Sequence, residues 1–273
     1  MKNKNRKPIT QKFVKKDNIC NICQQEAILS EDHVPPKACP PLKDRIINIL
    51  LYEFTNERGF KPRNTQNGVL YKTICSDCNN KLGINYDRRL GEFSRQIEKF
   101  VETKLELPPA FQVECYPNAI MRSVLGHLLA AKTETDNSEI DRLIRPCILD
   151  DSIPIPQDIN IFYWVYPYER TIILRDFGMP SIRGNLKTFG IFNLLKFYPV
   201  AFLVSHKCVD YESLHNLNSF KKLSPKDVAC IDIDLTSTKK SSWPEECNGL
   251  ENFLMIGKAA NDSVYSVPRS NKK

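Results

Sequence analysis

Apolar residues recur at helical spacing in two segments that follow residue 86. The first segment carries Leu90, Phe93, Ile97, Phe100, Val101 and Leu105. Separations of three and four residues place these side chains on one helix face, and we expect Asp87 to cap this helix and Pro108-Pro109 to end it. The second segment carries Val124, Leu125, Leu128 and Leu129. Asn118 is suited to cap its start.

Runs rich in β-branched and aromatic residues are typical of the remaining second half. Four of them predict strands, at 160–168, 171–175, 198–205 and 228–235. Residues 134–142 are polar and predict a loop or a short helix, and residues 243–260 predict a C-terminal helix. The second half is therefore expected to be an α+β domain.

The first third of the chain has a different pattern. Residues 19–83 are rich in turn-forming residues, among them Pro35-Pro36 and Asn67-Gly68, which indicates a small, irregular unit. The sequence thus predicts four parts. They are a basic flexible tail (1–16), a first domain with a trailing helix (17–107), a larger α+β domain (108–268) and a short basic tail (269–273).

The formal net charge of +7 sits at the two ends of the chain. Residues 1–16 hold seven bases and no acid, residues 17–107 hold 13 of each, and residues 108–268 hold 16 bases and 19 acids. This distribution excludes a histone-like binder. A local excess of eight bases over three acids remains across residues 58–95. It suits contact with nucleic-acid phosphates, although such a run is also typical of a solvated face.

Composition and the terminal segments narrow the class of protein. An apolar content of 41% is enough for a real core. No apolar run reaches the roughly 20 residues of a membrane span, and no hydrophobic segment follows the basic N-terminus. We therefore expect a cytoplasmic protein with no membrane association. In a reducing compartment, the ten cysteines favour a metal site over disulfides.

Four of the cysteines form two Cys-x2-Cys pairs, and the other six are scattered singly. The pairs are Cys20 with Cys23 and Cys75 with Cys78. Each pair can give two ligands from one turn, and four thiolates complete a closed tetrahedral Zn²⁺ site. The predicted zinc is structural, because it holds a segment that is too small and polar to bury a core of its own. Redox-active or merely buried cysteines are the alternatives.

An Asp32-His33 dipeptide lies between the pairs, and Asn79 and Gly83 follow the second pair. The arrangement Cys-x2-Cys, Asp-His, Cys-x2-Cys-Asn-x3-Gly resembles the HNH endonuclease superfamily, also called the ββα-metal or His-Me finger superfamily. It is most similar to the zinc-containing branch in which Asn replaces the last His, as in recombination endonuclease VII of phages. The resemblance covers residues 19–85, under a third of the chain.

The resemblance implies a small zinc-stabilised ββα-metal (treble-clef-like) nuclease domain. In it, a hairpin presents Asp32 and His33 against a helix that begins at the second cysteine pair. Asp32 and Asn79 would bind one catalytic Mg²⁺ or Mn²⁺, since oxygen ligands suit a hard cation. His33 would be the general base that activates water, leaving a 5′-phosphate and a 3′-hydroxyl.

The chain departs from the family pattern at several positions. His33 and Cys75 are 42 residues apart, so we expect an insertion over residues 40–66. Asn67 is the candidate for the middle Asn that braces the loop carrying His33, and Asn64 is its alternative. Asn80 is an alternative to Asn79. Glu31 is either a second metal ligand or a solvated hairpin residue.

Two functions follow from this sequence. The first is a DNA endonuclease with a single catalytic metal, in which residues 108–268 target, sense or regulate through a ligand or protein partner, as in defence or restriction nucleases. Cleavage of double-stranded DNA would suit a homodimer. The alternative is a non-catalytic, zinc-stabilised nucleic-acid-binding module in which Asp32-His33 is a turn and Asn79 a helix cap. His127 is expected to be a hydrogen-bonded core histidine, and Cys39 a buried thiol.

Overall fold

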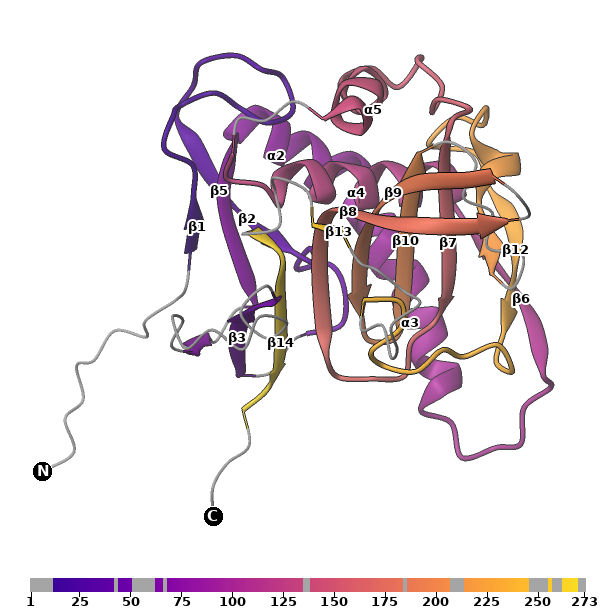
Figure 1. Ribbon diagram of the computed structural model, residues 1–273. Coiled ribbons are helices and arrows are strands. Elements are labelled where there is room, and N and C mark those ends of the chain that lie inside the picture. Colours follow the sequence, from indigo (N-terminus) through magenta and orange to yellow (C-terminus); the bar gives the residue numbers. More distant parts are fainter. Residues whose placement is uncertain are drawn as a thin grey trace, which may run out of the picture.

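The structure is a computed structural model that describes residues 12–41, 44–50, 62–65, 68–134, 138–183, 186–206, 214–245, 255–256 and 262–269. Within these ranges the chain forms three β-sheets and a set of helices, an α+β architecture as predicted (Figure 1). No helix in these ranges is both long and apolar enough to cross a bilayer.

The cysteine pairs lie beside a three-stranded sheet with the strand order β1-β5-β2. Its strands are β1 (Lys12–Val14), β5 (Val69–Cys75) and β2 (Leu29–Val34). β1 pairs with β5 in parallel, and β2 pairs with β5 antiparallel. β5 passes directly into helix α2 (Ser76–Leu82), so the second cysteine pair spans a strand–helix junction.

Helix α2 continues without a break into a π-helical segment η1 (Gly83–Asp87) and then into α3 (Arg88–Val101). The predicted helix is confirmed by α3, but the expected cap at Asp87 was wrong because the helix continues from α2 through η1. Asp87 has helical backbone angles and caps nothing, and α3 ends before Leu105, which is 78% exposed. The periodic pattern missed α2 because only Cys78 and Leu82 of that helix are buried.

Helix α4 (Pro117–Ala130) crosses the middle of the molecule, between the three-stranded sheet and the large sheet (Figure 1). All 14 of its residues are buried, as expected for a helix enclosed on every side. It begins after Tyr116, so Asn118 is not its cap but lies in its first turn. Helix α5 (Glu139–Leu149) follows and is capped by the hydroxyl of Ser138.

The large sheet has nine strands. In spatial order they are β11 (His215–Asn216), β7 (Ile159–Val165), β10 (Val200–His206), β9 (Leu186–Phe197), β8 (Thr171–Arg183), β14 (Val264–Pro268), β3 (Arg45–Ile49) and β4 (Arg63–Thr65), with β13 (Met255–Ile256) paired to β8. A separate pair joins β6 (Ala110–Cys115) to β12 (Ala229–Asp234). A short 3-10 helix, η2, covers Asn218–Phe220.

Four strand predictions are confirmed by β7, β8, β10 and β12, whereas β9 was not predicted. The predicted helix over 243–260 is wrong at Met255–Ile256, which is a strand. The rest of that prediction from residue 246 onward lies outside the described residues.

The first third of the chain contributes to the large sheet. β3 and β4 come from the segment predicted to be an insertion, and β3 pairs with β14. One cluster of buried apolar side chains extends from Phe13 to Val264. Among the described residues, the predicted boundary at 107/108 therefore does not separate two cores.

Candidate metal centre

Four cysteine side chains converge where the turn that holds Cys20 and Cys23, here called the first cysteine turn, meets the β5–α2 junction. The Sγ atoms of Cys20, Cys23, Cys75 and Cys78, here called the thiol cluster, all lie within 4.8 Å of one another. Cys23 Sγ and Cys75 Sγ are 3.9 Å apart. Four sulfurs at about 2.3 Å from a tetrahedral zinc would be separated by about 3.8 Å. The cluster therefore has the dimensions of a closed Zn²⁺ site.

Local structure brings each pair together. The first pair lies in a tight turn closed by the Ile19–Glu26 bridge, with Gln24 in the left-handed region at φ 59°. In the second pair, Cys75 ends β5 and Cys78 lies in the first turn of α2. The backbone N–H of Cys75 donates to Cys20 Sγ over 3.3 Å, an interaction that favours the thiolate. The hydrogen bond between Cys20 and Cys78 lowers the pKa of Cys20 and raises that of Cys78.

Buried hydrogen bonds attach the thiol cluster to the rest of the molecule through Asn21. Its amide nitrogen donates to the carbonyls of Leu129 and Lys132, at 3.1 and 2.6 Å. Its side-chain oxygen accepts from Lys15 Nζ at 2.9 Å, and its carbonyl accepts from Arg145 Nε at 2.7 Å. The first cysteine turn is thus bonded to the end of α4 and to α5.

Strand β2 carries the predicted Asp32-His33 pair on opposite faces, because successive side chains of a strand alternate. Ser30 and Asp32 lie on the face toward α2 and α4, whereas Glu31 and His33 lie on the other face. Asp32 is 4% exposed and Glu31 is exposed.

Asn79 of α2 contacts β2 directly. Its side-chain nitrogen donates to Ser30 Oγ at 3.1 Å and to the carbonyl of Glu31 at 3.0 Å. The structure therefore brings Asn79 to the residue that precedes Asp32, on the face that Asp32 shares with Ser30. Asn80, its predicted alternative, is exposed.

The carboxylate of Asp32 has a partner that the sequence did not indicate. Its Oδ2 lies 2.9 Å from Nδ1 of His127, and Nε2 of the same imidazole lies 2.9 Å from Oδ1 of Asp87. His127 is fully buried, which confirms that it is a hydrogen-bonded core histidine. We call Asp32, His127 and Asp87 the His127 row.

Electrostatics favour a charged imidazole in this row. Burial disfavours the imidazolium, but the two flanking carboxylates outweigh it and hold the pKa of His127 well above its usual range. Burial also raises the pKa of Asp32, and His127 offsets only part of that effect. The row is therefore a charged imidazole held between two carboxyl groups.

His33 has a different environment. It is half-buried, and among the described residues no group accepts from or donates to its Nε2. Burial, with a smaller contribution from the charge of Lys37, lowers its pKa to about 4. The imidazole is therefore neutral at pH 7, which is the state a proton acceptor needs.

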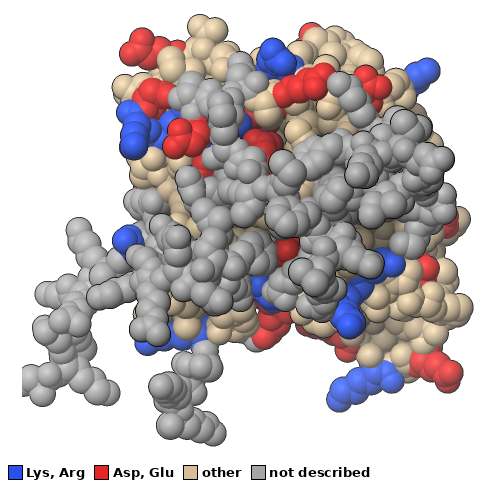
Figure 2. Space-filling model, viewed as in Figure 1, with Lys and Arg blue, Asp and Glu red and all other residues tan. Residues whose placement is uncertain are grey.

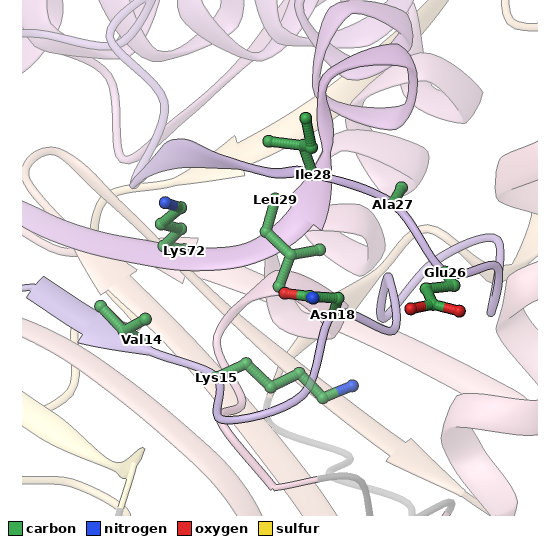
Figure 3. A pocket seen from close by; sticks show the side chains of 8 residues that line it. All are labelled: Val14, Lys15, Asn18, Glu26, Ala27, Ile28, Leu29 and Lys72. Atoms are coloured by element: carbon green, nitrogen blue, oxygen red, sulfur yellow. The ribbon is translucent and has the colours of Figure 1, made fainter.

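A groove of about 390 Å³ lies between β1, the first cysteine turn, β2 and β5 (Figure 3). Val14 and Lys72 lie at one end and Glu26 at the other. Lys72 pairs with Glu31 across the β2–β5 ladder, so it lies on the His33 face of the sheet. The side chain of Ile28, on the rim, is 88% exposed.

Other predicted residues lie elsewhere. Asn67, the candidate middle Asn, lies outside the described residues. Asn64 lies in β4 of the large sheet, whereas His33 lies in the three-stranded sheet. Cys39 is buried beside Ser94 and burial raises its pKa, which confirms a buried thiol.

Sequence reasoning missed Asp87 and the role of His127. Asp87 was interpreted as a helix cap because it precedes a periodic apolar segment. His127 was interpreted as a core residue because leucines surround it in the sequence. Neither residue has a spacing that links it to Asp32. Only the packing of α4 against β2 and η1 brings them together.

The distribution of charged side chains on the surface does not mark the site. On the face drawn in Figure 2, basic and acidic side chains of the described residues are interspersed.

Comparison of the chain with protein-family models, curated proteins and solved structures gave no match.

Proposed function

We propose that this protein is a divalent-metal-dependent DNA endonuclease of the HNH type that hydrolyses phosphodiester bonds in the cytoplasm. The observation that carries the proposal is the contact of Asn79 with β2 beside Asp32 and His33, at the edge of a thiol cluster. The antiparallel β2–β5 pair followed by α2 is compatible with the ββα-metal unit that the sequence implies. The thiol cluster would hold the structural zinc.

The donor set of the proposed cation site is compatible with Mg²⁺ or Mn²⁺. Asp32 supplies a carboxylate and Asn79 an amide oxygen, and both ligand types suit hard cations. Asn79, from α2, contacts Ser30 on the face of β2 that also carries Asp32. Oδ2 of Asp32 is bonded to His127, so Oδ1 would be the atom that binds the cation. When bound, the cation would stabilise negative charge on the phosphate and on the departing 3′ oxygen.

His33 would accept the proton from the attacking water. The low pKa of its imidazole keeps the ring neutral at neutral pH, which is the state that a general base needs. Lys72, on the His33 face, would contact a phosphate of the substrate strand.

The test is nicking of supercoiled plasmid DNA by the full chain with Mg²⁺ or Mn²⁺. We expect His33→Ala to lower the nicking rate by about 10²–10⁴-fold, as for loss of a general base. His215→Ala, which changes a histidine at the edge of the large sheet, is the matched control and should nick like the wild type. Equal rates for wild type and His33→Ala would reject His33 as the base.

A non-catalytic nucleic-acid-binding module is the second candidate. The observation that favours it is the near-complete burial of Asp32 against His127. This function predicts that the wild type shifts DNA in a gel but does not nick it with Mg²⁺, Mn²⁺ or Ca²⁺. Metal-dependent nicking that His33→Ala abolishes would exclude it.

A further inference from the structure

Three buried polar groups from distant parts of the sequence form the His127 row. Asp32 comes from β2, Asp87 from η1 and His127 from α4, and each hydrogen bond is 2.9 Å long. The exposed fraction is 4% for Asp32, 8% for Asp87 and 0% for His127. A second residue of α4 supports the row, because Ser123 Oγ donates to Asp87 Oδ1 at 2.7 Å.

The row connects the two elements that carry the proposed cation ligands. Asp32 lies on β2, and Asn79 lies on the continuous helix that also carries Asp87. The wider π-helical turn at Gly83–Asp87 lies between Asn79 and α3. One rigid imidazole, bonded to Asp32 on one side and Asp87 on the other, therefore bridges the strand and the helix.

Close packing of α4 keeps the bridge in place. A Cβ added to Gly126, the residue before His127, would lie 2.4 Å from Cδ2 of Leu82 at the end of α2. The absence of a side chain at position 126 thus lets α4 rest directly on α2. Thr73 Oγ1 of β5 donates to the carbonyl of Ala130 at 2.5 Å, which attaches the end of α4 to the sheet.

We propose that His127 is a positioning residue: its imidazole orients the Asp32 carboxylate and fixes the separation of Asp32 and Asn79, so that both reach one divalent cation. The proposal rests on the proposed function. It places part of the active site beyond residue 108, in the segment that the sequence left without a motif. The partner of a metal-binding carboxylate commonly sets its orientation and thereby the affinity of the site.

Two substitutions at position 127 separate the two bonds. The amide of His127→Asn reaches the place of Nδ1 and keeps a partner for Asp32, whereas the amide of His127→Gln reaches the place of Nε2 and keeps a partner for Asp87. We expect His127→Gln to weaken Mn²⁺ binding about tenfold or more, and His127→Asn to weaken it less. A role in folding alone would leave Mn²⁺ affinity of the folded protein unchanged in both variants.

The measurement is titration of Mn²⁺ into the zinc-loaded full chain, followed by electron paramagnetic resonance of free Mn²⁺. Zinc content and circular dichroism check that each variant is folded. Asp87→Asn, which keeps the shape of the side chain, supplies a third variant if His127→Gln does not fold, and it should weaken Mn²⁺ binding in the same direction. The half-saturating Mg²⁺ concentration for plasmid nicking should rise in parallel.

The outcomes separate this inference from the proposed function. Wild-type nicking together with unchanged Mn²⁺ affinity in the variants overturns the positioning role and leaves the endonuclease proposal standing. Absence of wild-type nicking, together with Mn²⁺ affinity that falls in Asp32→Asn and His127→Gln, overturns the endonuclease proposal and supports the positioning role.

Discussion

The thiol cluster and the His127 row hold neighbouring parts of the molecule by different chemistry. The thiol cluster joins the first cysteine turn to the β5–α2 junction through four cysteine Sγ atoms. The His127 row joins β2, η1 and α4 through one imidazole and two carboxylates. The thiol cluster is a set of sulfur ligands, which suits zinc. The His127 row is a buried ionic network.

The difference concerns what each arrangement needs in order to be stable. Thiolates that converge within 4.8 Å repel one another unless a cation or protons neutralise them. The row carries its own counter-charge, since the imidazolium lies between the carboxylates. We therefore expect the thiol cluster to depend on bound zinc, and the row to depend on the packing of α4.

The largest effect is expected for Cys75→Ser, which removes one sulfur of the thiol cluster. A structural zinc site contributes of order 10 kcal/mol to folding, so its loss should abolish a cooperative melt and not merely lower the Tm. Zinc content by mass spectrometry and thermal denaturation by circular dichroism are the measurements. Because the core is continuous from Phe13 to Val264, the loss should extend beyond residues 19–85.

Cys230→Ser is the matched control for the thiol cluster. Cys230 is exposed and lies in β12, so its substitution should leave zinc content and Tm unchanged. A Cys75→Ser protein that lacks zinc and still melts like the wild type would contradict a structural role for the metal.

The two arrangements also differ in how far the sequence predicts them. Cys20 with Cys23 and Cys75 with Cys78 are readable because a ligand pair three residues apart has a local geometric cause, a turn or a first helical turn. Asp32, Asp87 and His127 have no such local relation. Their meeting depends on a buried helix whose polar residues resemble isolated core positions.

The large sheet shows the same limit. β7, β10 and β12 were predicted because β-branched and aromatic residues give a local signal. The order of the strands was not, since β3 reaches β14 across more than 200 residues of sequence. Strand pairing at that sequence distance depends on which strand edges remain uncovered once α4 is packed. The sequence of a single segment does not contain this information.

A smaller effect is expected for Asn21→Ala, which tests whether the thiol cluster and the packing of α4 are separable. The variant leaves the carbonyls of Leu129 and Lys132 without their buried donor, whereas the amine of Lys15 keeps the carbonyl of Ile19. Buried polar groups that lose a partner cost about 1–3 kcal/mol each when they stay dry, so a total near 3 kcal/mol is expected. Urea denaturation measures it.

Zinc content should stay at the wild-type level in Asn21→Ala, because the four sulfurs are unchanged. Gln25→Ala, in the same turn but exposed, is the control and should melt like the wild type. Loss of zinc in Asn21→Ala alone would show that the cluster and the helix contact form one unit.

The smallest effect is expected for Asp87→Asn, which removes one charge of the His127 row and keeps its shape. We expect a loss of about 2 kcal/mol near pH 6, since hydrogen bonds to charged groups contribute roughly 1.5–3 kcal/mol. The pKa of His127 is raised in the folded protein by Asp32 and Asp87 against the effect of burial. Its protonation therefore favours the folded state.

The sign of the pH dependence follows from this linkage. The contribution of a raised histidine pKa is complete below the unfolded value of about 6.5, and it is lost as the pH rises through the folded value. In Asp87→Asn one of the two flanking charges is gone, so the folded pKa of His127 lies lower and the contribution is smaller. The stability gap between wild type and variant should therefore narrow in urea denaturation as the pH rises through the folded pKa of His127. A constant gap, together with a neutral His127 imidazole at pH 7 in ¹⁵N NMR, would mean that the row is held by hydrogen bonds without an ionic component.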